Sequence, residues 1–151
     1  ELCDFLIQKK AVNIHMGISP YYRGATCNFW ALYEKKPEFV GATIHYLSKG
    51  LDSGKMIMHA FPKPCIVDSF ELGMRSVRAA QEGVCSLIKD KILFNYEPMI
   101  QDKSLQIRYS KRSEFNDQVA EEFLNNPLAD KFIFDRCTDR DLTQFLRPFI
   151  A

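Results

Sequence analysis

The alternation of apolar and polar positions predicts three β-strands in the first half of the chain. Each stretch has either apolar residues at alternate positions or a high content of β-branched and aromatic side chains. The stretches are residues 11–16, 39–47 and 55–61. On a strand, side chains two positions apart lie on the same face. We therefore expect Asn13 and His15 to point together from the first strand, while Val12, Ile14 and Met16 face a core.

Apolar residues three or four positions apart predict helices around these strands. Residues 2–9 are typical of the end of a helix, and residues 25–36 predict a helix that stops before Pro37. The clearest helix begins after Asp68, with Glu71 three positions on as its capping-box partner. This helix is amphipathic. Its apolar stripe consists of Phe70, Met74, Val77, Val84 and Ile88.

The pattern becomes irregular from about Phe94, and we divide the chain there into residues 1–93 and a mixed, mainly helical tail, residues 94–151. In this tail, Ser113 can cap a short amphipathic helix. The apolar stripes of the tail are Phe115, Val119 and Phe123, followed by Leu142, Phe145, Leu146 and Phe149. Such a tail needs a surface to pack on, either the first part of this chain or a partner subunit.

The composition excludes several classes of protein. The 151 residues are 46% hydrophobic and 26% charged, which favours one ordinary domain with a packed core. With 20 basic and 19 acidic residues, the net charge of +1 indicates no broad nucleic-acid-binding surface. Five cysteines without a CxxC pair argue against a disulfide framework and a zinc site, and predict reduced thiols in a cytoplasmic protein. No apolar stretch is long enough to span a membrane, so no membrane partner is expected.

Asn13, His15 and Asp52 are the groups that could carry chemistry. His45 lies near the end of the second predicted strand, and Asp52 follows in a loop with two glycines. An Asn can donate to a developing oxyanion, a His can donate or shuttle a proton, and an Asp can accept one or set the state of the imidazole. If the first strand is parallel and central, its polar groups lie where open α/β sheets bind ligands. The spacing also fits a simpler interpretation, in which these residues satisfy backbone groups at a strand end and a turn.

Three sequence blocks occur in a distinctive order. They are N-x-H-x-G-x-x-P-Y-Y-R-G at 13–24, G-A-T-I-H at 41–45 and L-D-S-G at 51–54. In this order and spacing they resemble the N10-formyltetrahydrofolate-dependent formyltransferases, a family that includes methionyl-tRNA, glycinamide ribonucleotide and sugar-nucleotide formyltransferases. The resemblance covers roughly residues 11–60 and continues more weakly to residue 93. It implies an α/β fold, namely the C-terminal portion of a Rossmann-like formyltransferase domain with a short helical tail.

The resemblance also implies roles for particular residues. The catalytic residues would be Asn13, His15 and Asp52. Supporting positions are His45, Arg23 and Gly24, with Arg23 expected to anchor its loop rather than to catalyse. The loop that lines the pterin end of the folate implies cofactor-binding residues Ser48, Lys49, Gly50, Leu51 and Gly54. No metal site is expected, although four side chains could be drawn as ligands: His15, His45, His59 and Asp52.

The implied activity is formyl transfer from N10-formyltetrahydrofolate to an amine. Asn13 and a protonated His15 would stabilise the oxyanion, while Asp52 would keep His15 charged and help to remove the amine proton. The sequence GISP at 17–20, together with NFW at 28–30, resembles the sugar-nucleotide branch of the family. We therefore expect a small-molecule amine acceptor, such as an amino-sugar nucleotide. A methionyl-tRNA formyltransferase-like enzyme is the alternative.

The N-terminal βαβ half of the family has no counterpart before Ala11, where only the end of a helix precedes the first strand. We expect a truncated or incomplete chain, or a partner that supplies the missing half. A homo-oligomer formed through the C-terminal tail is a further expectation. The chain would then be either the catalytic part of an enzyme or a catalytically incomplete module that acts in binding or assembly.

Overall fold

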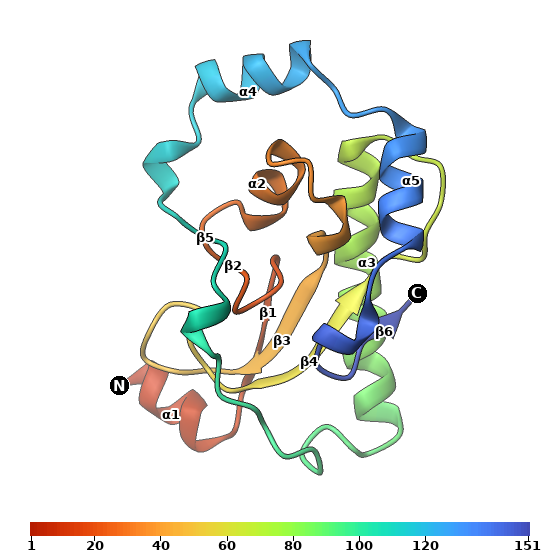
Figure 1. The fold of residues 1–151 in the computed structure, drawn as a ribbon. Helices are drawn as coiled ribbons and strands as arrows, with labels where there is room; N and C mark the ends of the chain where they lie inside the picture. Colours follow the sequence, from red (N-terminus) through yellow and green to blue (C-terminus); the bar gives the residue numbers. More distant parts are fainter.

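A mixed four-stranded sheet forms the centre of the computed structural model, which describes residues 1–151 (Figure 1). Its order is β1-β3-β4-β6. The strands are β1 (Val12–His15), β3 (Ala42–Tyr46), β4 (Met56–Phe61) and β6 (Phe149–Ile150). The β1/β3 and β3/β4 pairs are antiparallel, and β6 is parallel to β4. A smaller parallel pair joins β2 (Tyr22–Gly24) to β5 (Arg108–Ser110).

The three predicted strands are confirmed, but the possibility of a parallel, central first strand is not. Strand β1 lies at one edge of the sheet and runs antiparallel to its neighbour β3. An alternating pattern shows which residues share a face, but it carries no information about the direction or the neighbours of a strand. The tail supplies the fourth strand, β6, where the sequence predicts only a helical stripe.

Five α-helices surround the sheets. They are α1 (Leu2–Gln8), α2 (Cys27–Tyr33), α3 (Ser69–Lys89), α4 (Asp117–Asn125) and α5 (Asp130–Thr138). The predicted cap of α3 is confirmed, because the Asp68 carboxylate accepts a hydrogen bond from the Glu71 backbone N–H at 2.7 Å. No helix combines the length and the apolar character needed to cross a membrane.

The buried face of α3 differs from the stripe that the sequence predicts. Phe70, Met74 and Ile88 are 76%, 51% and 58% exposed. The buried side consists mainly of small residues: Leu72, Ser76, Ala79, Ala80, Gly83 and Leu87. Small side chains let the helix backbone approach the sheet closely, and a Cβ on Gly83 would lie 3.1 Å from the side chains of Met58 and Phe149. Close packing therefore decides the face, rather than the largest apolar residues.

The core has two parts, and β1 contributes to the second. One cluster lies around Tyr22, Trp30 and Phe61, and the other around Ile44 and Leu87. The apolar residues predicted to face a core from β1 pack on the second cluster, which confirms that expectation: Val12, Ile14 and Met16. Asn13 and His15 consequently point away from it, towards the opposite face of the sheet.

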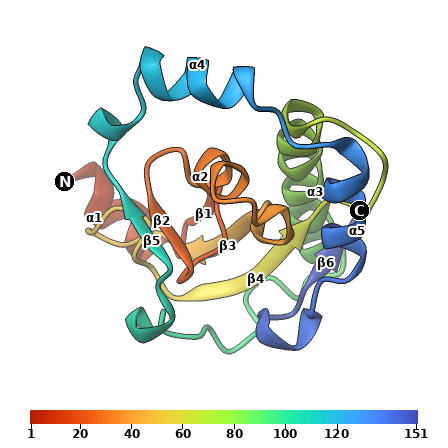
Figure 2. The same ribbon diagram turned by 45° about the horizontal axis from the view of Figure 1, so that its top comes forward.

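The tail packs on the first part of the chain, one of the two surfaces considered above. It runs around α2 as an arc of β5, α4 and α5 (Figures 1 and 2), and Phe123 of α4 stacks edge-on against Phe29 of α2. Ile133, Cys137 and Phe145 are buried in the first core cluster.

Three details of the predicted tail are wrong. Helix α4 is capped by Asn116, whose side chain accepts from the Val119 N–H, because Ser113 lies in a 3₁₀ turn (Arg112–Glu114). The last stripe is a 3₁₀ turn (Leu142–Gln144) followed by β6, since pairing with β4 competes with helix formation. Helix α5 has no counterpart in the expected elements.

Candidate active site

The carboxylate of Asp52 is the meeting point of three polar side chains. Asn13 Nδ2 donates to Asp52 Oδ1 at 2.9 Å, although the two residues are 39 positions apart. His15 Nδ1 lies 3.1 Å from Oδ2, and His45 Nε2 lies 3.6 Å from Oδ1. The structure therefore brings together the proposed catalytic residues and His45.

The sheet register explains this convergence. Asn13 and His45 are direct partners in the antiparallel β1/β3 pair, and residues two apart on β1 share a face. His45 Nδ1 must carry a proton, because it is 2.8 Å from the Tyr46 carbonyl oxygen, which can only accept. His45 Nε2 is then free to accept from Asn13 Nδ2 at 3.2 Å. The amino group of Asn13 thus lies between two acceptors, and this arrangement fixes the orientation of its amide.

Asp52 is held ionised by its neighbours. The hydrogen bond from His15, and after it the nearby His45 ring, lower the pKa of Asp52 well below the usual carboxyl range, and these effects outweigh partial burial, which raises it. The backbone of Asp52 has φ +44°, in the left-handed region that Asp tolerates better than most residues. A charged carboxylate is therefore presented from a constrained turn.

A shallow hollow beside Asp52 coincides with most of the predicted cofactor loop. Its volume is about 340 Å³. The lining residues are Asn13, His45, Leu47, Ser48, Lys49, Gly50, Leu51 and Asp52. Gly54 does not line this hollow; a Cβ there would collide with the Tyr46 carbonyl oxygen, so this position requires close backbone approach. His15 does not line it either, and is only 6% exposed.

Cys27 contacts the other nitrogen of His15, a contact that the sequence does not predict. Its Sγ lies 3.5 Å from His15 Nε2 and 3.5 Å from the Gly24 carbonyl oxygen. Burial, with a further contribution from the Asp52 charge, raises the pKa of the Cys27 thiol to about 12. Cys27 is therefore a protonated thiol packed under the imidazole. No motif marks it, because a single cysteine at a helix start has no characteristic spacing.

Arg23 and Gly24 lie in β2 and tie the motif loop to the tail. Arg23 Nη1 donates to Gln106 Oε1 at 3.2 Å rather than to the Asp52 cluster. Gly24 has φ +92°, and a Cβ there would collide with the Ser110 carbonyl oxygen. The Gly24 contact lies within the β2/β5 pair, and the Arg23 contact is to a residue just before β5, so these residues hold the loop from outside the cluster.

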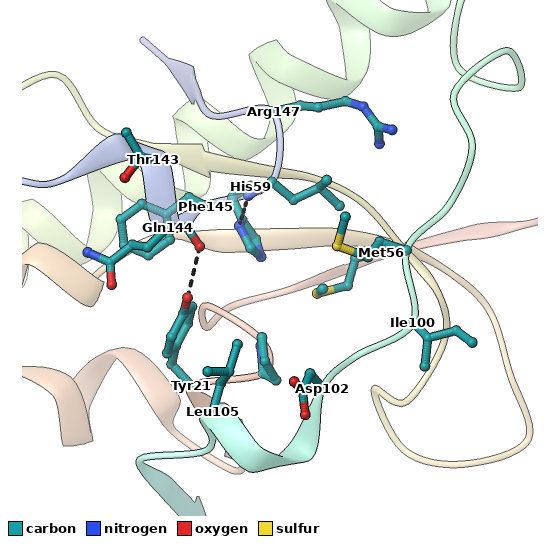
Figure 3. A pocket seen from close by; sticks show the side chains of 13 residues that line it. Tyr21, Met56, His59, Ile100, Asp102, Leu105, Thr143, Gln144, Phe145 and Arg147 are labelled. Atoms are coloured by element: carbon teal, nitrogen blue, oxygen red, sulfur yellow. Dashed lines mark hydrogen bonds between the residues drawn. The ribbon is translucent and has the colours of Figure 1, made fainter.

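His59 is separate from the Asp52 cluster. It lies on β4 beside a second cavity of about 220 Å³, here called the Met56 pocket, in which Tyr21 donates to the Gln144 carbonyl oxygen (Figure 3). His59 Nδ1 accepts from the Leu146 N–H at 3.0 Å, so Nε2 donates to the Ser19 carbonyl oxygen at 2.8 Å. Burial lowers the pKa of His59 to about 4, which keeps the ring neutral. His59 thus joins the tail to the sheet.

The family model described as Formyl transferase matches residues 5–86, more than half of the chain. The chain therefore belongs to the formyl transferase family. The match covers β1, β3, β4 and most of α3, and with them the whole Asp52 cluster.

Curated relatives are similar over shorter stretches. The chain is 38% identical over 50 residues to a methionyl-tRNA formyltransferase of Desulforamulus reducens, a stretch that covers 33% of this chain and 16% of the relative. It is 24% identical over 124 residues to a methionyl-tRNA formyltransferase of Gloeothece citriformis, covering 72% of this chain and 36% of the relative. The chain thus spans well under half the length of these relatives.

Solved structures share the fold. The formyltransferase PseJ from Anoxybacillus kamchatkensis, in complex with UDP-4,6-dideoxy-4-formamido-L-AltNAc and tetrahydrofolate, has a TM-score of 0.61 and 21% identity, covering 90% of this chain and 70% of that one. A 4-N formyltransferase from Francisella tularensis has a TM-score of 0.59 and 23% identity, covering 74% of this chain and 45% of that one. These likenesses bear out the expected formyltransferase fold.

Proposed function

We propose that this chain carries the reaction site of an enzyme that transfers a formyl group from N10-formyltetrahydrofolate to an amine on a small molecule, such as an amino-sugar nucleotide. The observation that carries the proposal is the convergence of Asn13 and His15 on the ionised Asp52, within a chain of the formyl transferase family. A carboxylate, an imidazole and an amide in contact are the groups that acyl transfer to an amine needs.

The reaction forms a bond between the acceptor nitrogen and the formyl carbon, and breaks the bond from that carbon to N10 of the folate. The formyl oxygen carries negative charge in the tetrahedral intermediate, the acceptor nitrogen loses a proton, and N10 takes up a proton as it leaves. Asn13 lines the hollow, and its amino group would exchange the longer contact, 3.2 Å to His45, for the oxyanion. His15 Nδ1 is engaged by Asp52, so Nε2 is the nitrogen left to donate, in place of its weak contact with Cys27.

Asp52 acts chiefly by holding His15. General bases work best with a pKa near the operating pH, whereas the pKa of Asp52 is lowered far from it. Its carboxylate therefore favours a proton on His15 Nδ1 and helps to remove the amine proton through a water molecule. This assignment sharpens the role that the resemblance implies.

The hollow beside Asp52 is the proposed place for the pterin end of the donor. Four of the five predicted cofactor residues line it together with Asn13. The complex of PseJ with tetrahydrofolate, in a chain of the same fold, supports N10-formyltetrahydrofolate as the donor. The sugar nucleotide in that complex, and the dTDP-3-aminofucose bound to an N-formyltransferase from Helicobacter canadensis, support the acceptor class.

The test is release of tetrahydrofolate from N10-formyltetrahydrofolate in the presence of amino-sugar nucleotides. Asn13→Ala should lower turnover on the order of 10²–10³-fold while the protein stays folded. Asn126→Ala is the matched control, because this exposed amide at the end of α4 bonds only the Glu122 carbonyl oxygen. Full turnover in Asn13→Ala would show that Asn13 has no catalytic role.

Methionyl-tRNA is the second acceptor to test, because the curated relatives that match the chain are methionyl-tRNA formyltransferases. Formylation of methionyl-tRNA in preference to amino-sugar nucleotides would replace the proposed acceptor. Folate binding without transfer to either acceptor would instead favour the binding or assembly module. Association with a second copy or a partner stays a prediction, which light scattering can test.

A further inference from the structure

We propose that Gln101, in the tail, is a positioning residue that holds the backbone of Asp52 in the geometry in which its carboxylate meets Asn13 and His15. The effect on formyl transfer rests on the proposed function. The effect on the Asp52 cluster does not, and it can be measured without substrate.

The side-chain amide of Gln101 spans the Asp52 turn. Gln101 Nε2 donates to the Asp52 carbonyl oxygen at 2.7 Å and to the Gly54 carbonyl oxygen at 3.0 Å. Gln101 is only 8% exposed, and its Oε1 is buried without a partner. Because both partners can only accept, the amino group must face the turn. The amide therefore satisfies two backbone carbonyls from one side, while the carboxylate is engaged on the other.

The turn needs such support. Asp52 has a left-handed backbone, φ +44°, which a non-glycine residue keeps only when its surroundings hold it. Its neighbours in the loop, Leu51 and Ser53, are exposed and give little packing. Loss of the Gln101 amide would leave two carbonyls to find water, and the turn could relax. Since the carboxylate is part of the same residue, its contacts with His15 and Asn13 would loosen.

Gln101 lies in a segment, residues 99–102, that is bound to the sheet. Met99 and Met56, the first residue of β4, exchange two backbone hydrogen bonds, 2.8 Å and 2.7 Å, in an isolated antiparallel bridge. The residues on either side of Gln101, Ile100 and Asp102, line the Met56 pocket (Figure 3). The same segment thus forms one wall of that pocket and supports the turn that carries Asp52.

The test is Gln101→Met, which keeps the length and volume of the side chain but removes both donors. Nitrogen-15 spectra of the histidine rings, at about pH 8, report whether His15 Nδ1 carries a proton. In the unchanged chain this proton should be present and hydrogen-bonded to Asp52. In Gln101→Met we expect the Nδ1-protonated signal to weaken, and kcat for formyl transfer to fall tenfold or more.

Two controls separate positioning from general destabilisation. His59 should keep its Nε2 proton in the variant, since its bonds to Ser19 and Leu146 do not involve the turn. Arg140→Met removes another buried side chain that donates to a backbone carbonyl oxygen, that of Glu38, and none of its contacts involves the Asp52 cluster. It should lower stability and leave the His15 signal unchanged. If Gln101→Met does not fold, Gln101→Asn gives the same test, because it keeps the amide but withdraws its donors from the two carbonyl oxygens by one methylene.

The outcomes distinguish the two proposals. An unchanged His15 signal together with unchanged kcat in a folded Gln101 variant overturns the positioning role and leaves formyl transfer standing. A weakened His15 signal, in a protein that transfers formyl to no acceptor, supports the positioning role and counts against the proposed function. Equal loss of the His15 signal in Arg140→Met also overturns the positioning role, because the effect would then follow stability alone.

Discussion

Replacing Asp52 by Asn tests the charge at the centre of the site with little change in shape. The variant keeps the size of the side chain but cannot be ionised, so Asn13 and His15 lose a negatively charged acceptor. We expect Asp52→Asn to lose stability at neutral pH and to lose formyl transfer, while the fold is retained.

The magnitude follows from two hydrogen bonds to one charged group. Asp52 accepts from Asn13 at 2.9 Å and is 3.1 Å from His15 Nδ1, whereas the His45 contact at 3.6 Å is too long to count. Hydrogen bonds to charged groups contribute about 1.5–3 kcal/mol each when buried. The Asp52 side chain is 19% exposed, so water screens part of this, and we expect a loss of about 2–3 kcal/mol. The midpoint of thermal unfolding should fall by about 4–12 °C.

The pH dependence of this difference is the sharper measurement. The pKa of Asp52 is lower in the folded chain than in the unfolded chain. Its contribution to stability is therefore present above the unfolded pKa, about 4, and is lost as the pH falls towards the folded pKa. Denaturant unfolding of the unchanged chain and of Asp52→Asn, from neutral pH down to about pH 3, should show two stability curves that converge in acid.

Subtracting the two curves removes the titration of all other carboxyl groups, because both proteins share them. Curves that stay parallel from neutral pH into acid would show that Asp52 is not held ionised by its neighbours. Full turnover of Asp52→Asn with a normal stability difference would refute the catalytic role alone.

Two further predictions concern the packing and the thiol. Leu72→Ala on the buried side of α3 should lower the free energy of unfolding by about 2–5 kcal/mol, measured by denaturant unfolding. Phe70→Ala on the exposed side should change it by less than about 1 kcal/mol. A larger loss in Phe70→Ala than in Leu72→Ala would contradict the face assigned to α3. Cys27 should resist alkylation by iodoacetamide at about pH 8, where exposed Cys3 reacts, because the raised pKa and the burial of Cys27 leave little thiolate. Peptide mass spectrometry measures the labelling of both cysteines. Equal labelling in the folded chain would exclude a buried thiol against His15.

Much of the site was open to prediction because its elements are local patterns. Alternation identified β1 and placed Asn13 and His15 on one face, and the glycine-flanked block around Asp52 marked a tight turn. The Asp68 cap of α3 was likewise readable from three neighbouring positions. The catalytic roles of these residues stay predictions that the variants above test.

Only the tertiary structure decided which surfaces meet. The periodicity of α3 contained two possible faces, and close approach to the sheet selected the small residues around Gly83 rather than the larger Phe70 and Met74. The stripe near Phe149 became a strand because the edge of β4 offered hydrogen bonds that a short helix could not match.

The same distinction separates the residues foreseen at the site from those missed. Cys27 contacts His15, and Gln101 contacts Asp52, but no spacing of residues in the sequence predicts either contact. The sequence by itself determined strands β1, β3 and β4, the main helix, the family and the polar groups of the site, because each depends on neighbouring residues. The edge position of β1, the buried face of α3 and the supports of Asp52 were decided by the fold, because long-range packing alone brings those residues together.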